Sequence, residues 1–160
     1  MKNADNQSPD VSRPHHIDIE PGRLIGRGHP AGDFLEAYKW TVTDEEPGRL
    51  VIDVHLPDQV LNPRGQLFGG FTPTYIDLIS IYCTRAGPDR RDPNTPRTWL
   101  STVNMRIDYY EPVVQPGFTL EAQVEHRRGK TWLVLAKMVQ NGKLATHALT
   151  TLRSIDPSAG

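Results

Sequence analysis

Two glycines and an aspartate stand at a spacing that suits attack on a carbonyl group. The run Asn62-Pro-Arg-Gly-Gln-Leu-Phe-Gly69-Gly70 is followed at once by an apolar segment that contains Asp77. Glycine N–H groups at the start of a helix can hold an oxyanion, and a carboxylate among apolar neighbours can attack a carbonyl or activate a water molecule. The amide of Asn62 could help to position the reactants. Together these four residues indicate a hydrolytic site.

The distance between the glycines and Asp77 limits how they can cooperate. Asp77 lies seven residues beyond Gly70, which is about 10 Å along a helix that rises about 1.5 Å per residue. Asp77 should therefore not share one carbonyl with the glycines of its own chain. A two-fold dimer with antiparallel helices would bring Asp77 of one chain to Gly69 of the other. Each residue also has an ordinary alternative, namely a tight turn for the glycines, a solvent-facing or capping carboxylate for Asp77, and an Asn-Pro turn for Asn62.

The apolar segment after the glycines is the strongest helix signal in the sequence. Thr72 is a good N-cap and Pro73 a good first helical residue, and Gly87 supplies a stop just after Ala86. Apolar side chains lie nearly all round this helix, so we expect it to be buried on most sides. The single cysteine, Cys83, excludes an intrachain disulfide and a multi-cysteine metal site, and on this helix it is predicted to be a buried small hydrophobe.

Strand signals lie on both sides of the helix. Two β-prone runs precede it, and four runs with strand patterns follow it, the third of which is apolar on both faces and so should be central in the sheet. Asn141-Gly142 is a strong hairpin signal. The predicted strands cover residues 37–43, 50–56, 102–109, 118–124, 131–140 and 144–153. We therefore expect an α+β domain in which an antiparallel sheet of about five to six strands wraps around one long central helix.

Length and composition bound the organisation of the chain. At 160 residues it should form one domain. We expect a flexible N-terminal tail at residues 1–28, the folded domain at 29–155 and a C-terminal tail at 156–160. The net charge of −1 gives no argument for binding nucleic acid or a membrane surface. No apolar run is long enough to span a membrane, and the N-terminus does not look like a signal peptide, so a cytoplasmic protein is expected.

The motif around the glycines resembles that of the hotdog-fold thioesterases of the phenylacetic-acid-degradation type, which act on acyl-CoA. That family carries Asn-x-x-Gly-x-x-His-Gly-Gly, six further residues and Asp. The matching residues here are Asn62, Gly65, Gly69, Gly70 and Asp77, with Phe68 in place of the usual His. The similarity continues through residues 101–112, 116–117 and 128–130, and covers roughly residues 33–153.

The resemblance implies a hotdog fold and hydrolysis of acyl-CoA or acyl-carrier-protein thioesters by a homodimer or homotetramer. Asp77 would be the nucleophile or the general base, and the Gly69-Gly70 helix start of the partner subunit would be the oxyanion hole. Thr102 would lie near Asp77 on the same chain, although it could equally be an outward-facing polar residue of a strand. Phe68 would contact the substrate.

A basic turn at Arg127, Arg128 and Lys130 is a further candidate for substrate binding. In the family, a basic residue at this turn commonly meets the phosphates of coenzyme A, and clustered cations favour phosphate in general. Exposed charges at a turn can also do no more than keep the surface solvated. No metal and no cofactor are expected, apart from the coenzyme A that forms part of the substrate.

Two other functions compete with thioester hydrolysis. Phe68 leaves open a non-catalytic acyl-thioester-binding module that has kept the fold and lost the activity. A hotdog hydratase or dehydratase is less favoured, because such enzymes need a His with an acidic partner near the central helix, and no His lies between Val60 and Thr98.

Overall fold

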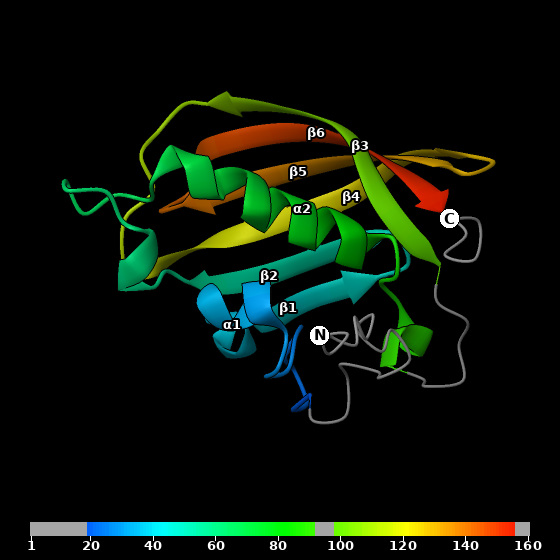
Figure 1. Cartoon of the computed structure of the whole chain (residues 1–160), viewed down its shortest axis with the longest axis horizontal. Coiled ribbons are helices and arrows are strands. Elements are labelled where there is room, and N and C mark those ends of the chain that lie inside the picture. Colours follow the sequence, from blue (N-terminus) through cyan, green and yellow to red (C-terminus); the bar gives the residue numbers. More distant parts are fainter. Residues whose placement is uncertain (1–18, 92–97, 156–160) are drawn as a thin grey trace, which may run out of the picture.

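A six-stranded antiparallel sheet wraps around one central helix, α2 (Figure 1). The computed structural model describes residues 19–91 and 98–155. Single 3₁₀ turns lie at Ala37–Lys39, Asp58–Val60, Gly69–Phe71 and Pro88–Arg91. The helices and strands, in chain order, are α1 (Pro30–Phe34), β1 (Thr41–Glu46), β2 (Arg49–His55), α2 (Thr72–Cys83), β3 (Trp99–Tyr109), β4 (Gly117–Arg128), β5 (Thr131–Gln140) and β6 (Lys143–Ile155).

The strand order β1-β2-β4-β5-β6-β3 places the first strand after α2 at an edge of the sheet, beside β6. Strand β5 is interior, as its two apolar faces predicted. Asn141 and Gly142 both have positive φ, at 52° and 73°, which is the conformation of the tight hairpin turn that this dipeptide favours. The predicted α+β architecture of one central helix and about six antiparallel strands is confirmed.

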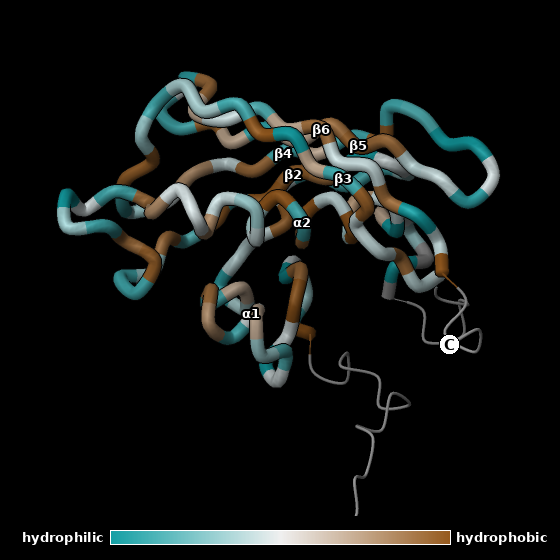
Figure 2. Tube along the Cα trace, turned by 45° about the horizontal axis from the view of Figure 1, so that its top comes forward, coloured by the Kyte–Doolittle hydropathy of each residue, from teal (hydrophilic) through white to brown (hydrophobic). Residues whose placement is uncertain are grey.

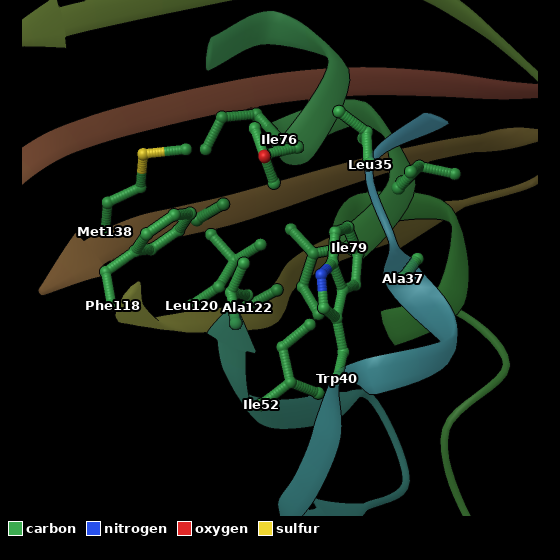
Figure 3. Close-up of a cluster of buried hydrophobic side chains, with 14 of the residues drawn as sticks. Leu35, Ala37, Trp40, Ile52, Ile76, Ile79, Phe118, Leu120, Ala122 and Met138 are labelled. Carbon is green, nitrogen blue, oxygen red and sulfur yellow. The ribbon is translucent and has the colours of Figure 1, made fainter. Parts of the chain in front are cut away.

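The core lies between α2 and the concave face of the sheet. Figure 3 shows Ile76 of the helix close to Met138 of β5, and the side chains of Ile76, Ile79, Leu120 of β4 and Met138 are all fully buried. Each such side chain contributes about 1.5–3 kcal/mol through its burial. Cys83 is also fully buried, as predicted.

The N-terminal segment adds a layer on the α2 side of the sheet (Figure 2). Residues 19–28 were assigned to the flexible tail, and that assignment is wrong, because Leu24 and Ile25 belong to the core. The Val42 N–H of β1 donates to the Gly22 carbonyl at 2.8 Å, which ties this segment to the sheet. The remaining predicted tails, residues 1–18 and 156–160, lie outside the described residues.

Several element boundaries differ from the predicted ones. Helix α2 begins at Thr72 itself and ends at Cys83. Beyond it the Arg85 N–H donates to the Tyr82 carbonyl at 3.0 Å, which is the i−3 bond of a tighter turn. Strand β1 starts at Thr41 rather than at residue 37, because the buried side chains of Ala37 and Trp40 hold the preceding residues in a 3₁₀ turn. Helix α1 was not predicted. None of the helices in the described ranges has the length and apolar character needed to cross a membrane.

Arg90 joins three segments that are distant in the sequence. Its side chain is only 5% exposed and forms a two-point ion pair with Glu45 of β1, at 2.5 and 3.0 Å. The same guanidinium donates to the Leu24 carbonyl at 3.3 Å. Arg90 therefore fastens the chain after α2 to β1 and to the N-terminal segment.

Replacing Arg90 should destabilise the fold. Arg90→Ala removes the two-point ion pair with the Glu45 carboxylate, which is 20% exposed, and we expect the free energy of unfolding to fall by about 2–4 kcal/mol. The matched control is Arg106→Ala, which removes an arginine that is 76% exposed and paired with Asp108, and which should cost less than about 1 kcal/mol. Urea unfolding followed by circular dichroism measures both. Equal losses for the two variants would contradict the role given to Arg90.

Candidate active site

Two consecutive backbone N–H groups project from the start of α2. The Phe68 carbonyl accepts from the Phe71 N–H at 2.8 Å, and the Gly69 carbonyl accepts from the Thr72 N–H. The C=O and N–H of one trans peptide point in opposite directions, so the N–H groups of Gly69 and Gly70 point away from the helix. Neither N–H has an acceptor within residues 19–91 and 98–155. Two open donors at the positive end of a helix are suited to an oxyanion.

The ring of Phe68 lies directly against Gly70. A Cβ atom on Gly70 would lie 2.6 Å from Cε1 of the Phe68 ring, so a side chain there would displace the ring. Phe68 is 55% exposed, and its ring meets Phe71 edge-on, with 6.0 Å between centroids. The Phe71 ring in turn packs against the Phe34 ring of α1, with 5.6 Å between centroids. The residue that replaces the family's usual His is therefore an aromatic wall beside the glycine pair.

Asp77 and Thr102 meet between α2 and β3. The Thr102 hydroxyl donates to Asp77 Oδ1. Asp77 is half-buried, and in the described part of the chain its Oδ2 accepts no hydrogen bond. One carboxylate oxygen is thus held in place, and the other is available to water or to a carbonyl carbon.

A β-bulge in β3 turns Thr102 toward the helix. Thr102 pairs with Leu152 of β6 and Asn104 with Thr151, which leaves Val103 as an extra residue. In a regular strand Thr102 would share a face with Asn104. The bulge places it instead on the face of the buried Leu152, where α2 lies. The alternation in the sequence could not reveal this change of face, whereas the family resemblance placed Thr102 near Asp77.

Asn62 builds the loop before the glycines. Its Oδ1 accepts from the Arg64 N–H at 2.8 Å and from the Gln66 N–H at 3.2 Å, and its own N–H donates to the Gln66 carbonyl at 2.7 Å. This is the turn role that was the alternative for Asn62. Its side-chain NH₂ has no partner in the described ranges, so the positioning role stays a prediction.

The glycines and Asp77 of one chain are not brought together. Helix α2 is continuous from Thr72 to Cys83, so Asp77 stands about 10 Å along the axis from Gly70. No hydrogen bond links the two parts within the described residues. A thioester carbonyl held by the glycines would need a carboxylate from elsewhere.

The predicted basic turn is present at the β4–β5 hairpin. Arg127, Arg128 and Lys130 are exposed, and the Arg127 guanidinium lies 4.0 Å from the centroid of the Trp132 ring, which restricts its motion. A fourth basic residue was missed. The exposed Arg153 of β6 pairs with Thr131, which pairs with Arg128, so both arginines stand in one row, and only the strand register shows this.

A hollow of about 280 Å³ adjoins Gly69. It lies between the loop before α2 and the ends of β3 and β6, and Leu67, Thr72, Tyr109 and Thr146 are among its lining residues. The Tyr109 hydroxyl donates to the Gly69 carbonyl at 3.1 Å. An acyl chain whose carbonyl sat on the glycine N–H groups would have room here.

Cys83 is not a candidate nucleophile. Burial raises the pKa of its thiol to about 12, so the thiol stays protonated at neutral pH, and it donates to the Gly48 carbonyl at 3.2 Å. Among the described residues, no three His, Cys, Asp or Glu side chains converge as a metal site would require.

The fold and the site define an α+β protein with a helix-start donor pair and a carboxylate on the same helix. The family model of the thioesterase superfamily matches residues 64–145, just over half of the chain, and the chain belongs to that superfamily. The matched segment includes Asp77, both glycines and Thr102. No curated protein sequence matches significantly.

Solved structures share the fold at low sequence identity. A phenylacetic-acid-degradation-related protein of Ralstonia eutropha JMP134 superposes with a TM-score of 0.66 and 21% identity, over 80% of this chain and 92% of its own. The PaaI protein of the E. coli phenylacetic acid degradation operon superposes with a TM-score of 0.63 and 18% identity, over 81% of this chain and 86% of its own. A hypothetical thioesterase of Streptococcus pneumoniae TIGR4, solved with coenzyme A, superposes with a TM-score of 0.60 and 17% identity, over 72% of this chain and 88% of its own. The architecture is the hotdog fold that the resemblance implied.

Proposed function

We propose that this protein hydrolyses acyl-CoA thioesters to a free acid and coenzyme A, in a dimer where each site combines two chains. The observation that carries the proposal is the pair of open N–H groups at Gly69 and Gly70, on the same helix as Asp77 with its Thr102 partner. Acyl-carrier-protein thioesters present the same reacting group and are the alternative substrate.

The reaction follows from these groups in one of two ways. As a general base, Asp77 takes a proton from water while the resulting hydroxide adds to the thioester carbonyl, and the oxyanion rests on the glycine N–H groups. The C–S bond then breaks, and the thiolate leaves and takes up the proton. As a nucleophile, Asp77 adds to the carbonyl and expels the thiolate, and water then hydrolyses the mixed anhydride. In both cases the Thr102 hydroxyl orients the carboxylate.

The edge of β3 supports the dimer. This strand is 11 residues long, lies at the end of the sheet in the described part of the chain, and carries Val103 at 60% exposure and Trp99 at 46%. Long apolar edges are normally covered, because their open N–H and C=O groups recruit another strand. A second copy of the chain over this edge would cover it and could place Asp77 near the partner's glycines.

The basic row at the β4–β5 hairpin is proposed to hold the phosphates of coenzyme A. Arginine binds phosphate with paired N–H donors, and Arg128 and Arg153 stand in one row two strands apart, which is about 10 Å at the usual strand spacing. The proposal needs no metal or other cofactor.

A non-catalytic binding module remains the second candidate, because Phe68 stands where the family usually has His. It shares every binding feature with the enzyme and lacks turnover. A hydratase would need an imidazole near α2, and residues 61–97 contain none.

The first test is Asp77→Asn. The amide keeps the shape of the carboxylate but cannot attack or take a proton, so turnover should fall by a factor on the order of 100 to 10,000, while substrate binding persists. Release of free thiol from a panel of acyl-CoA esters measures it. Asp53→Asn is the matched control, since Asp53 also accepts a threonine hydroxyl, from Thr119 at 2.9 Å, on two other strands. If the Asp77→Asn variant keeps the turnover of the wild type, the mechanism is wrong. If the wild type binds acyl-CoA but does not hydrolyse it, the non-catalytic binding module is favoured.

The second test concerns the basic hairpin. The double change of Arg128→Ala and Lys130→Ala should raise KM for an acyl-CoA and leave kcat nearly unchanged, because it removes binding that is equal in the ground and transition states. The effect should shrink for a pantetheine thioester, which lacks the nucleotide. Lys143→Ala, an exposed lysine of the β5–β6 hairpin, is the control. The same rise for both substrates would show that the cluster is structural.

The third test is the assembly. Sedimentation velocity at micromolar concentration should show a dimer or a tetramer rather than an 18.0 kDa monomer, because the β3 edge needs a partner. Val103→Lys places a charge on that edge at an exposed position and should weaken assembly and turnover together. A monomer with full activity would exclude a site shared between chains.

A further inference from the structure

Tyr109 holds the peptide that presents one of the two open N–H groups. Its hydroxyl donates to the Gly69 carbonyl at 3.1 Å, and its ring approaches Gly69 to within 3.8 Å of where a Cβ would stand. The same carbonyl accepts from the Thr72 N–H of α2. The Gly69 oxygen is therefore fixed from two sides, by the helix and by the end of β3.

Fixing this oxygen also fixes the Gly70 N–H. The two groups belong to one planar peptide and point in opposite directions, so a carbonyl that cannot rotate leaves an N–H that cannot rotate. Two donors on the carbonyl also polarise the peptide, and hydrogen bonds in such a chain strengthen one another. The Gly70 N–H thus becomes both better aimed and a stronger donor toward an anion.

We propose that Tyr109 is a positioning residue that aims and strengthens the Gly70 N–H as an oxyanion donor. This inference rests on the proposed hydrolase function. It assigns to Tyr109 an effect on the transition state, although its hydroxyl contacts only the protein backbone.

Strand β3 then supports both halves of the chemistry. It runs across α2 from the C-terminal end of the helix to its N-terminal end (Figure 1). Thr102, near the start of the strand, orients Asp77, and Tyr109, at its last residue, orients the glycine pair. In the proposed dimer, one β3 strand therefore positions Asp77 for one active site and the Gly70 N–H donor for the other active site.

The neighbouring tyrosine provides an internal comparison. Tyr110 is 58% exposed and Tyr109 55% exposed, yet the Tyr110 hydroxyl has no hydrogen bond in the described part of the chain. At such exposure a single hydroxyl bond contributes at most about 1 kcal/mol to stability. A purely structural role for Tyr109 therefore predicts no selective effect on kcat.

The experiment compares three tyrosine-to-phenylalanine variants. Tyr109→Phe should lower kcat about 5- to 30-fold, less than the roughly 100-fold or greater loss seen when an oxyanion donor is removed outright, with KM within about twofold because ground-state binding is retained. Tyr38→Phe changes a tyrosine of the 3₁₀ turn Ala37–Lys39, whose ring packs under the Arg27 guanidinium, and should leave both constants unchanged. In ¹H–¹⁵N spectra, the Gly70 amide proton should move upfield in Tyr109→Phe and stay in place in Tyr110→Phe.

The outcomes separate the inference from the function on which it rests. Unchanged kcat in Tyr109→Phe, or a Gly70 resonance that does not move, overturns the inference even if the wild type is an active thioesterase. A fall in kcat that comes with a lower melting temperature and an altered KM would also overturn it, because this combination indicates that the variant is destabilised as a whole. If the wild type hydrolyses no thioester, the proposed function fails, and the Gly70 resonance alone decides whether Tyr109 fixes the peptide.

Discussion

The burial of a helix that is apolar on most of its sides is the constraint on which this structure depends. Helix α2 buries Tyr75, Ile76 and Ile79 completely, and no flat surface covers so much of a cylinder. A strongly curved sheet does, with the N-terminal segment closing the side that the strands leave open. Polar groups that must do chemistry can then stand only where this cover ends, at the first turn of the helix and along its flank at β3. Both parts of the candidate site lie at these places.

The helix begins where this cover ends. Its start is bordered by Phe68, Phe71 and the end of β3, and it keeps two donors open. Both glycines are exposed, so an anion can reach these donors at the positive end of the helix. Phe68 gives this border an apolar side chain that does not titrate.

The local patterns of the sequence predicted much of the fold. The long run of apolar residues after the glycines, the alternation in β4 and the Asn141-Gly142 turn each express a preference of the backbone or of one face, and each element formed as expected. What failed depended on distant partners. Leu24 and Ile25 look like part of a polar tail until β1 is there to receive them. The bulge at Val103 turns Thr102 toward the Asp77 carboxylate on α2, and the row shared by Arg128 and Arg153 appears only once the strand register is known. The contact between Asp77 and Thr102 also depends on distant partners, and it was predicted from the family motif rather than from periodicity.

The thiol of Cys83 gives the protein an unusual experimental convenience. It is the only cysteine in the chain, it is fully buried, and burial keeps it protonated at neutral pH, so the folded protein offers no reactive sulfur of its own. Coloured thiol reagents can therefore follow coenzyme A release without a background from the catalyst. A cysteine placed on the surface, for example Lys143→Cys, would be the sole point of attachment for a spin label or fluorophore. One label on each chain would let the distance between the two chains of the proposed dimer be measured in solution without removing any native residue of the core.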